Sequence, residues 1–291
     1  MIQDLNTDNN SCAAWIAKFL INRKVEFVFG LQGGHIQPIW DHCYKLVLED
    51  WMVEKKPYKI NPSSIDIDKA VNTIRNSKKP LIITGRGALK GGQQILDFIN
   101  KYNIPYLDTQ DSRGLIPQSN ANNIFAARSK AMSEADLVIL LGRKLDYQLA
   151  FGSPAVFKEA KFIRISESAL ELTDNRRGFP EILSDPGVAI ELIHNKLKKS
   201  NFDETWINDI KNFHLEKIKK ALDKEVNKTG DDNKINPNLI FEKLKNIIDD
   251  DFVGIADGGD ILSFARVGLH SKYYLDSGTF GCLGVGIPYA I

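Results

Sequence analysis

Residues 78–88 read KKPLIITGRGA, in which the apolar run 81–84 ends at a glycine turn. A continuous apolar run is typical of a strand that is buried on both faces of a parallel sheet. Three further runs have this character, at residues 105–107, 137–141 and 162–165, and helical stretches such as residues 93–102 separate them. Strands that alternate with helices predict a doubly wound α/β domain with a parallel sheet and right-handed crossovers.

The α/β pattern is complete only in the middle of the chain. We expect a remnant of an N-terminal domain over residues 1–60, a central α/β domain over 61–199, and a helical linker with the start of another α/β domain over 200–291. The first 44 residues offer one helix from about Ser11, one strand at 27–29 and a glycine turn. So short a segment cannot close a core alone, because even domains of about 60 residues are marginal.

The composition is that of an ordinary globular chain. The 291 residues include 38 basic and 37 acidic side chains, for a net charge of +1, so nothing favours nucleic acid or a membrane surface as a partner. No apolar run approaches the roughly 18 residues that indicate a membrane span. The polar N-terminus shows no signal peptide, and three scattered cysteines are typical of a reducing compartment. We therefore expect a cytoplasmic protein with a small-molecule substrate.

A motif for dinucleotide binding is present but incomplete. Gly85-Arg86-Gly87 with Asp108 after the next strand is close to a dinucleotide fingerprint, but the next glycine, Gly91, is one position late. Close packing of a helix on a strand explains such glycines equally well, and a nucleotide held in a different manner stays open.

The histidines do not predict a metal site. His35 and His42 lack a third ligand at a usual spacing, and we expect His194 and His214 to be half-buried or exposed residues of helices. We assign no metal ligand and no catalytic residue.

A glycine-rich stretch closes the chain. Residues 275–291 read LDSGTFGCLGVGIPYAI, with Leu283 standing between Gly281 and Gly284. Glycine at this density lets the backbone approach a ligand closely. Upstream, an apolar run at 252–256 predicts a strand that leads into residues 257–260, Asp-Gly-Gly-Asp, and a helix.

Together these segments resemble the thiamine diphosphate-dependent enzymes of the acetolactate synthase and 2-hydroxyacyl-CoA lyase type. KKPLIITGRGA, DLVILLGRKLDYQLAFG and AKFIRISESALEL are similar to the central domain of that family. FVFGLQGGHIQPIWD at residues 27–41 is similar to the start of its pyrimidine-binding domain, and residues 252–291 to the start of its diphosphate-binding domain. The resemblance implies partial flanking α/β domains and a truncated or internally deleted member.

The resemblance also implies a cofactor site for thiamine diphosphate. The carbonyl of Gly281 and the N–H of Leu283 would meet the aminopyrimidine, and the Leu283 side chain would support the bent cofactor. The loop after the strand at 252–256 would lie near the diphosphate. The implied cofactor-binding residues are Gly259, Asp260, Gly281, Cys282, Leu283 and Gly284.

By the same resemblance, two functional elements have no counterpart in this sequence. The family's Mg²⁺ ligands, an Asp and an Asn, would follow Ile291, and neither Glu49 nor Glu54 has the setting of the activating glutamate. We therefore expect no thiamine-dependent turnover from the chain as given, and self-association as a homodimer or larger homo-oligomer.

The implied reaction is cleavage or formation of a carbon–carbon bond on a 2-keto acid, by a transferase or lyase. An alternative substrate class is 2-hydroxyacyl-CoA or oxalyl-CoA. A second hypothesis is a non-catalytic α/β module that binds a nucleotide or a partner. Some relatives hold FAD or ADP on the central domain; Arg143 and Lys144 are candidates for phosphate contacts, but Ser166 and Ser168 stand where a ribose-binding carboxylate is common.

Overall fold

The computed structural model describes residues 11–23, 59–109, 112–225, 234–244, 247–248, 252–269, 271, 273–278 and 281–290. The chain divides into two compact units, Lys59–Gly286 and Met1–Tyr58 with Ile287–Ile291. Within the described part of the chain, no helix is both long and apolar enough to traverse a bilayer.

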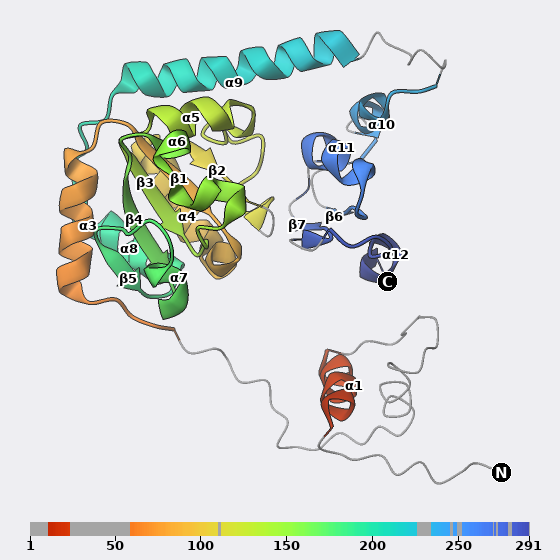
Figure 1. Cartoon of the computed structure of the whole chain (residues 1–291), viewed down its shortest axis with the longest axis horizontal. Helices are drawn as coiled ribbons and strands as arrows, with labels where there is room; N and C mark the ends of the chain where they lie inside the picture. Colours follow the sequence, from red (N-terminus) through yellow and green to blue (C-terminus); the bar gives the residue numbers. More distant parts are fainter. Residues whose placement is uncertain are drawn as a thin grey trace. The chain divides into compact units, whose positions relative to one another are not determined.

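A five-stranded parallel sheet forms the centre of the larger unit (Figure 1). Its strands, in the spatial order β2-β1-β3-β4-β5, are Tyr106–Leu107, Pro80–Thr84, Leu137–Leu141, Lys161–Ser166 and Glu181–Leu183. The four strands predicted from the sequence are confirmed as parallel neighbours, and β5 is an additional fifth strand. The chain therefore has the doubly wound α/β fold that the alternation of strands and helices predicted.

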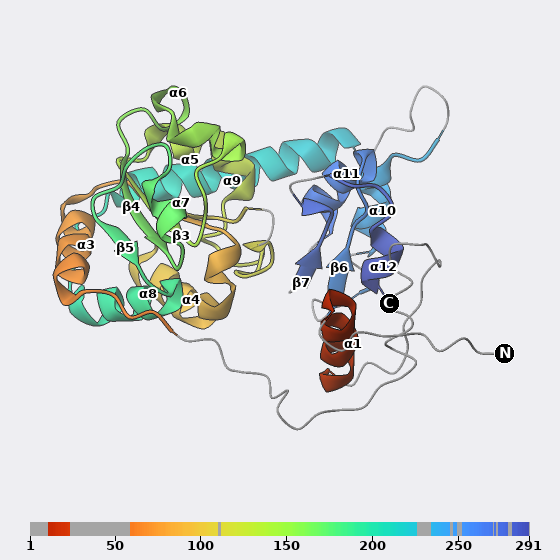
Figure 2. The same ribbon diagram turned by 60° about the horizontal axis from the view of Figure 1, so that its bottom comes forward.

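Helices cover both faces of this sheet (Figures 1 and 2). One face packs against α3 (Ser64–Asn76), α4 (Gly92–Tyr102) and α8 (Pro186–Lys196). The other packs against α5 (Arg128–Glu134), α6 (Pro154–Phe157) and α9 (Glu204–Glu225). Shorter helices in the connections are η1 (Arg86–Gly91), η3 (Phe125–Ala127), η4 (Tyr147–Gly152) and α7 (Ala169–Thr173).

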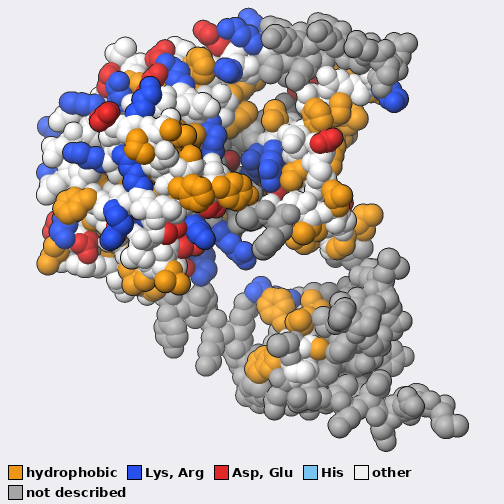
Figure 3. All heavy atoms as spheres, viewed as in Figure 1, with side chains coloured by type: hydrophobic (Ala, Val, Ile, Leu, Met, Phe, Trp, Pro, Cys, Tyr) orange, Lys and Arg blue, Asp and Glu red, His pale blue; other side chains and the backbone are white. Residues whose placement is uncertain are grey.

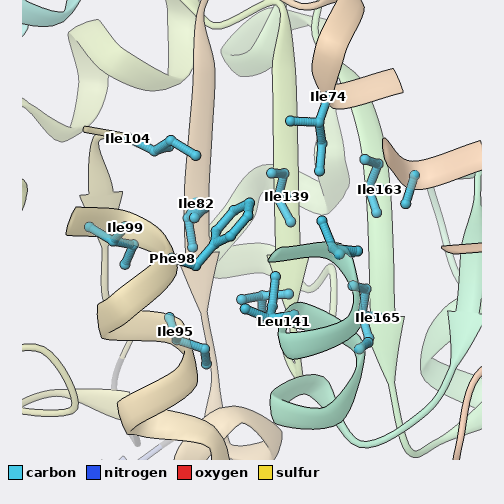
Figure 4. Packing of buried hydrophobic residues seen from close by; sticks show 14 of the residues in the cluster. Ile74, Ile82, Ile95, Phe98, Ile99, Ile104, Ile139, Leu141, Ile163 and Ile165 are labelled. Atoms are coloured by element: carbon cyan, nitrogen blue, oxygen red, sulfur yellow. The ribbon is translucent and has the colours of Figure 1, made fainter. Parts of the chain in front are cut away.

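Alternate strand residues divide between two cores, as the period of two in a strand requires. Ile82 and Ile139 face α4, whose Phe98 points onto the sheet beside them (Figure 4). Leu81 and Val138 face the opposite layer. All these side chains are fully buried, so both faces of the sheet are sealed from water.

The glycines of the imperfect fingerprint serve close backbone packing. The N–H of Gly87 donates to the carbonyl of Gly142 at 3.0 Å, and a Cβ on Gly87 would lie 2.8 Å from the Cα of Gly142. A Cβ on Gly91 would similarly lie 2.5 Å from the Cα of Gly187 in α8. Close packing of η1 against α8 and against the turn after β3 therefore accounts for these glycines without a ligand.

The C-terminal part of the larger unit contains a two-stranded parallel sheet. The two strands are β6 (Val253–Ile255) and β7 (Tyr273–Leu275). The helices of this part of the chain are α10 (Pro237–Leu244) and α11 (Asp260–Gly268), and α12 (Gly286–Ala290) begins at its last residue. Phe241 of α10, Leu262 of α11 and Tyr274 of β7 form its small core. The strand, acid-glycine loop and helix that the sequence predicted after residue 252 are all present.

In the N-terminal part of the smaller unit, residues 1–58, the one helix among the described residues is α1 (Cys12–Asn22). Ser11 caps it, because its Oγ accepts the N–H of Ala14 at 3.1 Å. The predicted strand at residues 27–29, its glycine turn, Glu49 and Glu54 lie outside the described residues.

Candidate functional site

The structure brings together the two loops that the sequence singled out. Residues 257–260 follow β6, and residues 281–286 follow β7, its neighbour in the sheet. A Cβ on Gly258 would lie 2.4 Å from the carbonyl oxygen of Cys282, and one on Gly259 would lie 3.2 Å from Cδ2 of Leu283. The loops meet because their strands are parallel neighbours, whose carboxyl ends lie at one edge. Gly258 thus has no room for a side chain.

Asp257 joins these two loops and was not among the predicted site residues. Its Oδ1 accepts the backbone N–H groups of Gly258 at 2.7 Å, Gly284 at 2.8 Å and Val285 at 3.1 Å. These bonds, the one from Gly258 first, hold the pKa of Asp257 below its ordinary value, and the N–H of Gly286 contributes in the same direction. A glycine-rich loop beside a strand-end carboxylate is the signal that points to this arrangement.

Two glycines and one side chain of residues 281–284 face open space. A Cβ built on Gly281 or Gly284 would meet no atom within 4 Å, and the Leu283 side chain is 75% exposed. Both glycines have positive φ, 59° and 87°, which turns the backbone outward at a conformation that other residues rarely adopt. Among the hydrogen bonds between described residues, none uses the Gly281 carbonyl or the Leu283 N–H. The Leu283 N–H thus fits the role implied for it with the aminopyrimidine, whereas the Gly281 carbonyl oxygen lies against Gly258, 2.8 Å from the position of a Cβ there.

The remaining predicted residues also lie at this site. Gly259, with φ 85°, precedes the first residue of α11, Asp260, which is exposed. The side chain of Cys282 is an exposed free thiol, and its backbone carbonyl contacts Gly258 of the first loop. All six predicted residues are therefore neighbours, although their contact with a cofactor stays a prediction.

A second group of charged residues lies at the carboxyl end of the central sheet. Asp108 follows β2 and is 6% exposed; burial raises its pKa, against the opposing charges of Arg113 and Arg128. Burial also lowers the pKa of Arg128, an effect that Arg143 and Arg113 reinforce and Asp108 opposes. Arg128 Nη1 donates to the carbonyl of Asp108 at 3.2 Å. Two guanidinium groups, those of Arg113 and Arg128, thus act on one buried carboxyl group, and Arg143 acts in turn on Arg128.

Arg143 is committed to an internal partner. Its Nη1 and Nη2 donate to the two oxygens of Asp146 at 2.9 and 2.8 Å, and Nη2 also reaches Gln148. Burial raises the pKa of Asp146, but the hydrogen bonds and charge of Arg143 outweigh this and hold the pKa below its ordinary value. On the face of the central domain seen in Figure 3, basic and acidic side chains lie among one another.

The serines at the end of β4 are held by internal contacts. Ser166 Oγ donates to Glu171 Oε2 at 2.9 Å, and Ser168 caps α7 by accepting the N–H of Glu171. These internal contacts involve both serines and Glu171, whereas Glu167, between the serines, is a partly exposed carboxylate after β4.

His214 differs from its expected exposure. It is 6% exposed, and its Nδ1 accepts the N–H of Ala126 at 3.1 Å while its ring meets Phe125 edge-on. The prediction was wrong because η3 packs against α9 at this point. Searched over the described residues, the chain shows no group of three or more His, Cys, Asp or Glu that could hold a metal.

Comparison with known proteins gives consistent matches. The chain is 30% identical over 250 residues to the 2-hydroxyacyl-CoA lyase of Saccharomyces cerevisiae, covering 81% of this chain and 44% of the relative. It is 28% identical over 234 residues to human 2-hydroxyacyl-CoA lyase 1, covering 76% and 40%. The oxalyl-CoA decarboxylase of Escherichia coli K12 is 25% identical over 247 residues, covering 82% and 43%. The chain spans less than half the length of these curated relatives.

The family comparison coincides with the central sheet. Residues 67–193 match the family described as "Thiamine pyrophosphate enzyme, central domain". These residues run from the start of α3 into α8 and include all five strands of the central sheet. The resemblance carried by the strand runs is therefore confirmed, and the chain belongs to the thiamine diphosphate-dependent enzyme family.

Proposed function

We propose that this chain serves thiamine diphosphate-dependent cleavage or formation of a carbon–carbon bond in a CoA thioester of the 2-hydroxyacyl or oxalyl class. The names of the relatives support this class over the free 2-keto acid that was expected first. Mg²⁺, the predicted domain boundaries at 61 and 199, and a homo-oligomer are further parts of the proposal.

One observation carries the proposal: the Gly258–Asp260 and Gly281–Gly284 loops meet, and the second exposes the Leu283 side chain between two glycines that face open space. The 2.4 Å separation between a Cβ on Gly258 and the Cys282 carbonyl shows how closely the loops approach. Backbone groups suit cofactor binding because they are fixed before the ligand arrives. Thiamine diphosphate, when bound, supplies a nucleophilic carbon for the substrate carbonyl and a store for the electrons released by bond cleavage.

In this proposal, the chain's own residues hold the cofactor and orient it. The Gly281 carbonyl would accept from the amino group of the aminopyrimidine, and the Leu283 N–H would donate to a ring nitrogen. The exposed Leu283 side chain would support the bend of the cofactor and lose its contact with water on binding. Gly259 lies where the loop would pass the diphosphate.

Cofactor binding by the purified chain tests this proposal. We expect thiamine diphosphate with Mg²⁺ to give saturable heat in titration calorimetry, and Leu283→Ala to weaken it by about tenfold, the effect of burying one leucine side chain. Leu170→Ala is the matched control, because Leu170 is 83% exposed on α7, outside the site. Unsaturable heat in the parent chain, or an equal loss in both variants, would refute the assignment.

The substrate class requires a separate assay. We expect no turnover from this chain alone, because its sequence shows no counterpart of the Mg²⁺ ligands or of the activating glutamate. When a chain that carries both is supplied with thiamine diphosphate and Mg²⁺, we expect turnover of a 2-hydroxyacyl-CoA or oxalyl-CoA in preference to pyruvate, measured as release of aldehyde or CO₂. Preferred turnover of pyruvate would instead favour the acetolactate synthase-like alternative.

The arginine group of the central domain favours a second candidate function, nucleotide binding. Arg113 and Arg128 carry positive charge beside Asp108, and the Nε of Arg113 has no hydrogen-bond partner among the described residues. Against it stand the pairing of Arg143 with Asp146 and the engagement of Glu171 by Ser166. Titration with ADP and with FAD tests it: Arg128→Gln should abolish binding, whereas Arg86→Gln, on η1, should not.

A further inference from the structure

The meeting of the two loops depends on one carboxylate. The N–H groups of Gly284 and Val285 lie 27 and 28 residues beyond Asp257 in sequence, yet both donate to its Oδ1. The N–H of Gly258 donates to the same oxygen, so the carboxylate joins the start of one loop to the end of the other.

The backbone geometry suits this arrangement. Converging backbone N–H groups form a concavity that binds an anion. Gly284, with φ 87°, allows consecutive N–H groups to point toward one oxygen. A Cβ on Gly286 would lie 3.1 Å from the Cβ of Asp257, so the backbone approaches the acid closely there as well. The concavity is thus filled from within the chain.

The open part of the second loop depends on these contacts. Among the described residues, no hydrogen bond fixes the Gly281 carbonyl or the Leu283 N–H. Their positions are set by Gly258, which leaves no space beneath the Cys282 carbonyl, and by the anchor at Gly284 and Val285.

We propose that Asp257 is a positioning residue, which holds residues 281–286 so that the Gly281 carbonyl and the Leu283 N–H face the thiamine moiety of the cofactor. The proposal rests on the proposed function of these loops. It gives Asp257 no contact with substrate or cofactor; its role is exerted through the backbone of Gly284 and Val285.

Amide hydrogen exchange tests the anchor without any ligand. In the full chain, Asp257→Ala should raise exchange of residues 284 and 285 by about tenfold or more, the effect of losing a hydrogen bond to a charged acceptor. Asp257→Asn keeps an oxygen acceptor without its charge and should give an intermediate rate. Asp97→Asn, an exposed acid of α4 that accepts only from Gln93, is the matched control and should change neither amide.

Ligand binding separates positioning from a general structural role. Asp257→Ala should weaken thiamine diphosphate binding by about tenfold but inorganic pyrophosphate much less, both titrated with Mg²⁺, because the anchored loop is assigned to the thiamine moiety. Asp257→Asn should restore part of the thiamine diphosphate affinity. Equal losses for both ligands would mean that Asp257 merely folds the site, and would overturn the proposal.

The two proposals fail differently. Unchanged exchange at residues 284 and 285 in Asp257→Ala would overturn the anchor even if the parent chain binds thiamine diphosphate. Faster exchange with unaltered cofactor affinity would overturn positioning. A parent chain that binds neither ligand would refute the proposed function, and with it the role of Asp257 in cofactor binding, whatever its amide exchange shows.

Discussion

The central sheet and the β6–β7 sheet are both parallel, but they differ in how completely they are covered. Every residue of β1 and β3 is buried. In the two-stranded sheet, Gly254 and Tyr274 are buried, whereas Val253, Tyr273 and Leu275 are 52%, 60% and 45% exposed. Parallel sheets are usually covered on both faces, so the smaller sheet has only one of its two layers within the described residues.

The two regions also differ in what their residues contribute, stability in the central domain and ligand binding in the C-terminal part. The central domain combines two extensive cores, and its glycines are used for internal packing. The C-terminal part uses its glycines to expose backbone, with Gly281 and Gly284 facing open space. Binding residues commonly lie on loops that a rigid scaffold positions. We therefore expect substitutions in the central domain to act on stability and those in the C-terminal loops to act on ligand affinity.

The largest effect should come from the central core. Phe98→Ala removes a fully buried ring that packs beside Ile82 and against Tyr102. We expect it to lower the free energy of unfolding by about 3–5 kcal/mol, because it leaves a cavity in a sealed layer. Urea unfolding followed by circular dichroism measures the change. Leu170→Ala should stay within about 0.5 kcal/mol; similar losses in both variants would contradict a close-packed core.

Two glycines offer a direct comparison of the regions. Gly142 and Gly281 have nearly equal φ, 56° and 59°, so alanine introduces similar backbone strain at each. A Cβ on Gly142 would lie 2.4 Å from the backbone of Gly87, whereas one on Gly281 would meet nothing within 4 Å. We expect Gly142→Ala to lower the free energy of unfolding by about 1–3 kcal/mol more than Gly281→Ala, owing to overpacking.

The same pair sharpens the functional difference. Gly281→Ala should weaken thiamine diphosphate binding, because its methyl group enters the space assigned to the cofactor, while Gly142→Ala should leave binding unchanged under folding conditions. Chemical denaturation and calorimetry on the two purified variants measure both quantities. Loss of stability in Gly281→Ala as large as in Gly142→Ala would show that the loop is packed rather than open.

A smaller effect should appear with pH. Burial lowers the pKa of His214 in the folded chain below its ordinary value of 6.5, so the unfolded chain takes up a proton first as the pH falls. The free energy of unfolding should therefore decrease as the pH falls below about 6.5 and level off below the folded pKa. His214→Gln should remove this contribution to the slope, measured by urea unfolding from pH 7.5 to 5.5. An unchanged slope would exclude His214 as its source.

The sequence predicted the central fold well because its signals are local. Runs such as residues 137–141 are continuous, apolar and bounded by turns, and β3 has these same bounds. β5 was missed because Glu181–Leu183 has only three residues and no such run. Arg164 was not recognised as a structural residue: it is 1% exposed in β4 and donates to the carbonyls of Leu172 and Asp174 at 3.0 and 2.7 Å. A buried arginine depends on distant carbonyls that no local pattern reveals.

The candidate site was predicted in part for the same reason. The glycine-rich segments around Gly259 and Gly281 are visible in the sequence, and their resemblance to a known family identified them. Asp257 was missed because its partners, Gly284 and Val285, come near it only when β6 pairs with β7. Long-range pairing therefore separates what sequence reasoning found from what it did not.

The smallest effect should come from the exposed face of the β6–β7 sheet. Val253 and Tyr273 are opposite one another in the parallel register, and both side chains are more than half exposed. Threonine keeps the β-branched shape of Val253, and at position 273 it keeps a residue type that favours strands. We expect Val253→Thr with Tyr273→Thr to change the free energy of unfolding by no more than about 0.5 kcal/mol per site.

The same double variant should reduce the self-association predicted from the sequence, because less apolar surface is left to bury between copies. Sedimentation velocity at several concentrations measures this; an unaltered oligomer distribution, or a stable monomer in the parent chain, would contradict it.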